Sequence, residues 1–431
     1  MRRKFTGNLI FCGLMVLVLA GMFACRDRVP DVQWNYSSSQ VVREVPSQGD
    51  TIDIDIYLDA TKSMLGFIAN SNSNYNQFLE ELETTAGVGW RDADVRFFKF
   101  GTRIKEIDRD GYRAAKYRQF YIEPGIFEKT NIDEVLNQTD ISRVSVVITD
   151  LFQDEGDINS IVQQIKDRCF KQGIQVAILG VKSDFDGWVY DVGPGKPPYQ
   201  LKTGQNDVDK YRPFYALMFG DPLNIERLFD NLNSRPFVRE DNFLVLSRHI
   251  INGFKIKAGK SRESRGLNVQ ATSKDEPENL FKFVLKKEND EGLVEAEIEL
   301  DRNSRTPDFA ADRMELVVYK KTATGTDSVL VNDDLELNSV QRDGDRLQLT
   351  LKLELDDPVG KYGYLVYLQA AAIGGLAVPQ WVTDFSSANP SRNLDANKTL
   401  NLEKFVTDLL RASLAIHQPR IAQMYLSVRK L

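Results

Sequence analysis

Hydrophobic positions between residues 51 and 235 follow two alternating patterns, short apolar runs and helical repeats. Ile52–Leu58 has isoleucine at every second position before it becomes fully apolar, which indicates a strand. The apolar residues from Tyr75 to Leu82 follow the spacing of an amphipathic helix. Alternating strands and helices predict an α/β domain over residues 51–235, with a doubly wound, mostly parallel sheet and helices on both faces. The further strands expected are Val95–Phe100, Gln119–Ile122, Val144–Ile148, Ile174–Val181 and Phe214–Phe219, and the further helices contain Ile132–Leu136, Ile158–Ile165 and Asn224–Leu232.

After about residue 240 the pattern changes to β-rich runs separated by turn residues. Many short strands without helices predict an antiparallel β-sandwich-like domain over residues 240–375. A C-terminal helical segment, residues 376–431, contains one amphipathic helix around Leu402–Leu410. The strands expected in the β-rich domain are Phe243–Leu246, Leu267–Ala271, Leu280–Leu285, Val294–Leu300, Met314–Tyr319, Ser328–Val331, Leu347–Leu355 and Tyr362–Ala370.

The first 25 residues have the composition of a targeting signal. Three basic residues open the segment, and residues 9–24 form an uncharged apolar run that ends at Cys25. This run is short for a membrane span, which takes about 20 residues. A cysteine in this position resembles the lipid-attachment site of bacterial lipoproteins, although Met22 and Phe23 replace the usual leucine and small residue. The resemblance implies lipidation of Cys25; an uncleaved anchor and ordinary signal-peptidase cleavage are the alternatives.

Residues 26–50 are polar and suit a tether between a membrane and a folded body. The formal charge is −7, and it becomes −10 without the three basic residues of the signal. An acidic body with no long basic run is a poor nucleic-acid binder. Only two histidines are present, so no histidine-based metal motif is available. Beyond Cys12 and Cys25, Cys169 has no partner for a disulfide, and we expect it to pack beneath a helix.

The stretch that carries chemistry is Ile54–Ser63, which reads I-D-I-Y-L-D-A-T-K-S. An apolar strand ends at Asp59, and two hydroxyl residues, Thr61 and Ser63, follow at two-residue spacings. Where the chain turns at the end of a strand, residues with this spacing can converge on one point above the sheet. A carboxylate and two hydroxyls are half of the oxygen shell that Mg²⁺ prefers, with Mn²⁺ and Ca²⁺ as alternative ions.

This stretch resembles the D-x-S-x-S motif of von Willebrand factor type A domains, with Thr61 in place of the first serine. The family's other ligands have candidates in the same order, Thr130 at the start of a helix and Asp150 at the end of the strand V-V-I-T-D. The resemblance covers about residues 51–233. It implies a metal-ion-dependent adhesion site in which Thr61, Ser63 and Thr130 bind the ion directly and Asp59 and Asp150 supply carboxylates. Lys129 and Leu151 stand where that family usually has glycine.

Each of these residues also has a structural interpretation. Asp59 could cap the turn after its strand, Thr130 could be a helix N-cap, with Asp133 completing a capping box, and Asp150 could bind backbone amides. Met64 and Phe67 either pack beneath the motif or form a rim that faces a partner. The acidic residues from Asp154 to Asp157 fit an exposed loop and helix start.

The expected function is that of a binding module rather than an enzyme. The site type and the signal segment together indicate a membrane-anchored lipoprotein of the bacterial cell envelope. Such a protein would capture an acidic group on a protein partner through Mg²⁺. One alternative is a structural envelope scaffold with a vestigial metal site. A metal-dependent hydrolase is less favoured, since Lys62 is the only local phosphate-binding candidate and no Gly-rich phosphate cradle follows.

Overall fold

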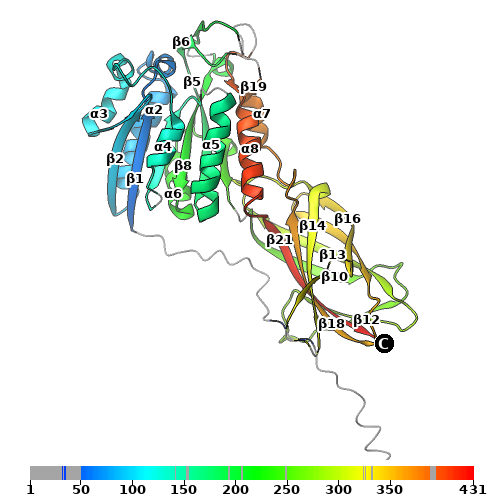
Figure 1. Cartoon of the computed structure of the whole chain (residues 1–431). Helices are drawn as coiled ribbons and strands as arrows, with labels where there is room; N and C mark the ends of the chain where they lie inside the picture. Colours follow the sequence, from blue (N-terminus) through cyan, green and yellow to red (C-terminus); the bar gives the residue numbers. More distant parts are fainter. Residues whose placement is uncertain are drawn as a thin grey trace, which may run out of the picture.

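The computed structural model consists of an α/β domain and a β-sandwich that follows it (Figure 1). The predicted signal with Cys25, most of the predicted tether, His249 and Asp154 lie outside the described residues. The described residues are 32, 34, 50–140, 142–151, 155–192, 195–204, 207–247, 250–323, 325, 327–331, 333–388 and 395–431. Among them, no helix is both long enough and apolar enough to span a membrane.

The sheet of the α/β domain has seven strands in the order β3-β2-β1-β4-β8-β5-β9. The α/β class is therefore as predicted. Only the pairs β1–β2 and β1–β4 are parallel, however, so the prediction of a mostly parallel sheet was wrong. The strands are β1 (Thr51–Asp59), β2 (Asp92–Phe100), β3 (Ile104–Ile107), β4 (Val144–Thr149), β5 (Gln175–Ser183), β8 (Arg212–Gly220) and β9 (Phe243–Leu246).

The antiparallel pairs around β8 arise from the connection between β5 and β8. A parallel neighbour needs a crossover that carries the chain back across the sheet, usually through a helix. The described part of residues 184–211 instead contains the hairpin of β6 (Asp186–Val189) and β7 (Tyr199–Lys202) and a short 3₁₀ turn, η5 (Val208–Lys210). The chain thus returns beside β5 in the opposite direction, and β8 lies between β4 and β5.

Helices cover both faces of this sheet, as predicted (Figure 1). One core contains Ile54 and Ile56 of β1 together with the buried sides of α2 (Asn74–Val88) and α6 (Pro222–Leu232). The opposite core contains Tyr57 and Val147 with α4 (Ile132–Gln138), α5 (Glu155–Arg168) and the C-terminal helix α8 (Leu402–Leu414). β4 is buried on both faces because its residues alternate between these two cores.

The β-sandwich packs a smaller and a larger sheet around one hydrophobic core. The smaller sheet has the order β10-β13-β17-β16, and the larger has the order β11-β12-β21-β18-β14-β15. The smaller sheet comprises β10 (Ile251–Lys260), β13 (Glu291–Arg302), β17 (Arg346–Glu354) and β16 (Leu335–Asp343). The larger sheet comprises β11 (Leu267–Gln270), β12 (Leu280–Leu285), β21 (Arg420–Lys430), β18 (Gly360–Ala370), β14 (Met314–Thr322) and β15 (Val329–Val331).

Three segments differ from the sequence-based expectation. Gln119–Ile122, expected as a strand, lies largely in the 3₁₀ helix η3 (Arg118–Tyr121), where Phe120 and Tyr121 are buried. β9 was expected in the β-rich domain but forms the edge of the α/β sheet. The C-terminal segment contains not only α8 but also β21, which pairs with β18 and lies parallel to β12. Cys169 is buried in the core beside α5, as expected, and this burial raises the pKa of its thiol to about 12.

Candidate metal centre

The predicted site residues meet at the carboxyl ends of β1 and β4, which are parallel neighbours. Asp59 is the last residue of β1, and Asp150 directly follows β4. Thr61 and Ser63 lie in the turn and the 3₁₀ helix η1 (Lys62–Ile68) that follow β1. All five predicted residues, Thr130 among them, are buried. This edge of the sheet points away from the sandwich (Figure 1).

Hydroxyl and carboxylate oxygens form one connected cluster at this edge. The Thr61 hydroxyl donates to Asp59 Oδ1 at 2.7 Å, and the Thr61 backbone amide donates to the same oxygen at 3.0 Å. Thr61 Oγ1 also lies 3.1 Å from Ser63 Oγ and 3.2 Å from Thr130 Oγ1. Thr130 in turn donates to Asp59 Oδ2 at 3.3 Å. The spacing of the D-x-T-x-S motif therefore does bring its three side chains together.

Thr130 belongs to this cluster rather than to a helix cap. The N-cap of α4 is Asn131, which makes no side-chain capping bond, so the interpretation of Thr130 as an N-cap was wrong. The segment before Thr130 is held against the end of β2, since the Thr102 backbone amide donates to the Ile126 carbonyl at 2.8 Å. Gly101 makes this approach possible, because a Cβ there would lie 1.9 Å from the Ile126 oxygen. The approach carries Thr130 to Asp59, 71 residues away in the sequence.

Thr149 is a member of the cluster that the sequence analysis did not identify. Its hydroxyl donates to Asp59 Oδ2 at 2.8 Å and accepts from the Leu151 backbone amide at 3.2 Å. Its position beside Asp150, at the end of a strand adjacent to β1, was the available signal. Thr149 fixes the orientation of the Asp59 carboxylate and ties the turn at Asp150 to it.

The buried position of Asp59 and the nearby carboxylate of Asp150 make it unfavourable for Asp59 to carry a negative charge. Burial raises the pKa of Asp59 well above its usual range, and the nearby charge of Asp150 raises it further. The hydrogen bonds from Thr61 and Thr149 act in the opposite direction. Among the described residues, the ion pairs of this strand involve Asp53 and Asp55 but not Asp59. A cation bound between the carboxylates would offset both the desolvation and the mutual repulsion.

The oxygen spacings fit a small hard cation. Neighbouring ligand oxygens of an octahedral Mg²⁺ site lie about 2.9 Å apart, because its bonds are 2.0–2.1 Å long. The distances of 3.1 and 3.2 Å from Thr61 Oγ1 to the hydroxyls of Ser63 and Thr130 are close to that value. No three His, Cys, Asp or Glu side chains of the described residues gather as a metal site. The candidate centre is of a different kind, because three of its five side chains carry hydroxyls rather than carboxylates.

The hairpin β6–β7 supports the motif from one side. A Cβ on Gly187 would lie 2.6 Å from Gly66 Cα, and a Cβ on Gly66 would overlap the ring of Phe185, so both glycines permit this close approach. Phe67 packs edge-on against Phe185 with ring centres 4.9 Å apart. Met64 and Phe67 are buried in the core below the motif, which excludes the partner-facing rim for these two side chains.

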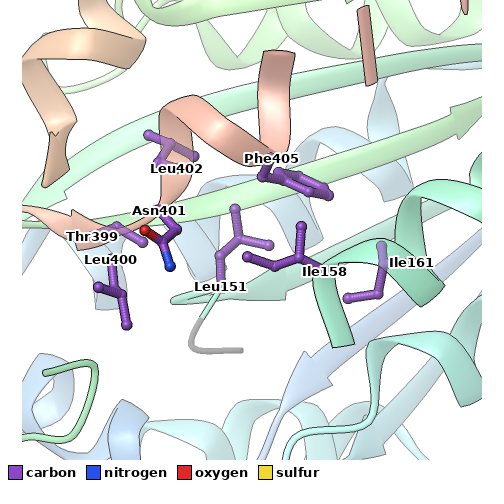
Figure 2. Close-up of a pocket in the computed structure, with 8 residues that line it drawn as sticks. All are labelled: Leu151, Ile158, Ile161, Thr399, Leu400, Asn401, Leu402 and Phe405. Carbon is purple, nitrogen blue, oxygen red and sulfur yellow. The ribbon is translucent and has the colours of Figure 1, made fainter. Parts of the chain in front are cut away.

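Leu151, at a position where von Willebrand factor type A domains usually have glycine, has a backbone conformation that normally favours glycine. Its φ of +56° is in the left-handed region, which is uncommon for a residue with a Cβ. The side chain is buried and lines a small apolar cavity with Ile158 and Ile161 of α5 and with Phe405 of α8 (Figure 2). Packing against two helices therefore holds Leu151 in this strained conformation.

Because Leu151 is strained, glycine is expected to destabilise the protein less than alanine at this position, the reverse of the usual order. Leu151→Ala should destabilise the protein by about 2 kcal/mol or more, because it removes buried side-chain volume and keeps the strain. Leu151→Gly should be about 1 kcal/mol less destabilising than Leu151→Ala, because glycine adopts a positive φ freely. Urea unfolding measures both variants. At Ile161, a helical control in the same core, glycine should instead be about 1 kcal/mol worse than alanine. The same order at both positions would contradict strain at Leu151.

Comparison with known proteins leaves the family of the chain open. No known protein family matches the sequence, and no curated protein matches it either. The site is therefore interpreted from its own geometry.

Proposed function

We propose that the α/β domain is a variant von Willebrand factor type A domain whose hydroxyl-rich centre binds Mg²⁺ and, through it, an acidic group of a protein partner. The observation that carries the proposal is the convergence of Asp59, Thr61, Ser63 and Thr130 on one point, with Asp150 near enough to raise the pKa of Asp59. The arrangement of β1, β2 and β4, with helices on both faces, supports the family. The antiparallel insertion of β8 is the feature by which this domain is a variant.

The side chains have separate roles in this proposal. Thr61, Ser63 and Thr130 present the hydroxyl oxygens that would hold the ion, and Asp59 and Asp150 balance its charge. Thr149 fixes Asp59 without contacting the ion itself. A bound Mg²⁺ would offer an open coordination position to a carboxylate of the partner.

The rim of the site suits an acidic partner. Lys62, next to Thr61, is exposed and its ammonium lies 4.4 Å from the centre of the Phe127 ring. Lys129, next to Thr130, is exposed as well. Positive charges beside the centre attract an acidic group and speed its encounter with the site.

The proposed location is the bacterial cell envelope, with the chain held at a membrane by a lipid on Cys25. The apolar run and the cysteine that ends it support this anchor. The proposed role is that of a binding protein. The alternative, a structural scaffold with a vestigial metal site, is distinguished from it by the peptide experiment below.

Two buried threonines that flank α4 make a matched test of the metal centre. Thr130→Val should weaken Mg²⁺ binding at least tenfold in titration calorimetry, because it removes a ligand oxygen. Thr139→Val should bind like the wild type, because the Thr139 hydroxyl donates to the Leu136 carbonyl at the other end of α4 and has no other hydrogen bond with a described residue. Equal weakening in both variants, or in neither, would contradict the assigned ligands.

Partner recognition is tested with immobilised peptides. A glutamate-containing peptide should retain the wild-type protein in Mg²⁺ and release it when a chelator is added. The matched glutamine peptide should retain it in neither condition. If the chelator did not release the protein, and if Thr130→Val bound the glutamate peptide as well as the wild type does, the protein would be a scaffold with a vestigial metal site.

A further inference from the structure

Two residues on the outer face of the larger sandwich sheet are buried although that face does not pack on the core. Side chains alternate between the two faces of a strand, and Tyr362, Tyr364 and Val366 of β18 point into the sandwich core. Gly363 therefore lies on the outer face, and so does Tyr425 of β21, since Met424 and Leu426 beside it are core residues. Gly363 is nevertheless buried, and Tyr425 is only 2% exposed.

Part of the covering comes from the tether. Val32 is only 5% exposed, although it belongs to a polar segment. A Cβ on Gly363 would lie 2.6 Å from Val32 Cγ1 and 2.7 Å from Trp34 Nε1, so both side chains lie directly over the glycine. The Trp34 ring is also 6.2 Å from the Tyr425 ring, and the Lys321 ammonium lies 5.8 Å from the centre of the Trp34 ring.

The contacts come from three adjacent strands and form a continuous surface. Lys321 of β14 is directly opposite Gly363 of β18, and Tyr425 lies on the next strand, β21. Glycine weakens a strand interior, and it is found where another backbone or side chain approaches closely. At Gly363 the missing side chain leaves room for Val32 and Trp34. The surface consisting of Lys321, Gly363 and Tyr425 is called the tether-docking surface below.

We propose that the tether-docking surface binds the chain's own Val32 and Trp34 and thereby holds the sandwich next to the membrane anchor, with the candidate metal centre directed outward. The membrane part rests on the lipid anchor of the proposed function, whereas the docking does not. Docking and metal binding use opposite ends of the molecule, since the centre lies at the edge of the α/β domain that points away from the sandwich (Figure 1).

Chain length gives the consequence of docking. Val32 is seven residues from Cys25, so the docked tether allows at most about 25 Å between the lipid-bearing cysteine and the sandwich. If the tether were released, the first fixed point would be Thr51, and 26 residues could extend up to about 90 Å. Docking therefore changes the height of the domains above the membrane and decides which domain faces it.

The docking is tested by protease cleavage of the full chain in detergent without Mg²⁺. Gly363→Leu places a side chain where Val32 and Trp34 lie, and chymotrypsin should cut after Trp34 at least tenfold faster than in the wild type. Gly259→Leu is the matched control, because a Cβ on this sandwich glycine meets nothing within 4 Å. Val32→Asp displaces the tether without altering the sheet and should also speed the cut. Unchanged cleavage in both Gly363→Leu and Val32→Asp would overturn the docking.

The orientation is tested on phosphatidylcholine vesicles that contain an acceptor dye. A donor on Val329→Cys reports the height of the larger sheet, since Val329 is 63% exposed and lies on the same level as Tyr364. Energy transfer should fall when Gly363→Leu is added and stay unchanged with Gly259→Leu. Equal energy transfer in the Gly363→Leu and Gly259→Leu proteins would overturn the membrane-proximal position of the sandwich. A chain that fails to bind vesicles would contradict the lipid anchor instead, and the cleavage result would then decide the docking alone.

Discussion

Replacing Asp59 with asparagine is expected to abolish Mg²⁺ binding and, at the same time, to stabilise the metal-free protein above neutral pH. The metal effect follows from the position of Asp59, which contacts Thr61, Thr130 and Thr149 at the centre of the cluster. The stability effect follows from burial, because an ionised carboxylate without a lysine or arginine partner is unfavourable in the interior. Asparagine keeps the shape of the side chain and removes this charge.

The pH dependence of the effect has a definite sign. Burial and the charge of Asp150 raise the pKa of Asp59 to about 7 in the folded protein, against an ordinary value of 3.8. The folded state thus binds the proton more tightly than the unfolded state, so this group stabilises at low pH and the contribution is lost as pH rises from about 4 to about 7. Metal-free wild type should therefore lose stability over this interval relative to Asp59→Asn. Urea unfolding in chelator from pH 5 to pH 8 measures the difference.

Asp55 provides the control on the same strand. It is as fully buried as Asp59, but it accepts charged hydrogen bonds from Arg96 and from Arg143, at 2.8 Å in each case. Asp55→Asn should therefore destabilise the protein at neutral pH, the opposite of the result for Asp59→Asn. If both variants were destabilised alike in chelator, Asp59 would be a structural residue and not a metal-site carboxylate.

The contrast between these two aspartates shows what the sequence could and could not reveal. Both lie in an apolar strand at alternating positions, and only the two hydroxyls that follow Asp59 distinguish it. That local spacing was enough to predict that Asp59, Thr61 and Ser63 come together. The partners of Asp55 are arginines from β2 and from the turn before β4, and such long-range pairing leaves no local signal.

The errors in the fold have the same origin. Buried strands such as β4 and β5 were recognised because β-branched and apolar runs are local features. The direction of β8 depends on the hairpin before it, and the short run Gln119–Ile122 is compatible with several conformations once its aromatic residues are buried. The alternation of Ala422, Met424, Leu426 and Val428 was a readable strand signal in β21. Thr130 was a ligand candidate only through the family resemblance, because the approach of Ile126 to Gly101 that brings it to Asp59 leaves no local signal in the sequence.

The second large effect is expected at Arg212, which joins the C-terminal segment to the α/β domain. Arg212 and Asp191 form an ion pair at 2.6 Å in which both side chains are 2% exposed. Arg212 also donates to the Ala396 carbonyl at 2.5 Å, and Asp191 accepts from the Leu400 amide at 3.3 Å. The pair therefore holds the chain that enters α8, one of the helices that line the cavity at Leu151 beside the candidate metal centre.

Arg212→Ala should destabilise the protein by about 3–5 kcal/mol, because it leaves a buried carboxylate without its counter-ion. Burial raises the pKa of Asp191 to about 6 even beside Arg212, which lowers it. Loss of Arg212 raises that pKa further, so the deficit should be larger at pH 8 than at pH 5. Urea unfolding gives the deficit, and amide exchange at residues 399–402 should become faster. The double variant Arg212→Leu with Asp191→Leu should lose less than Arg212→Ala, since no charge stays buried. If the double variant lost as much unfolding free energy as Arg212→Leu and Asp191→Leu lose together as single variants, the two residues would act independently rather than as a pair.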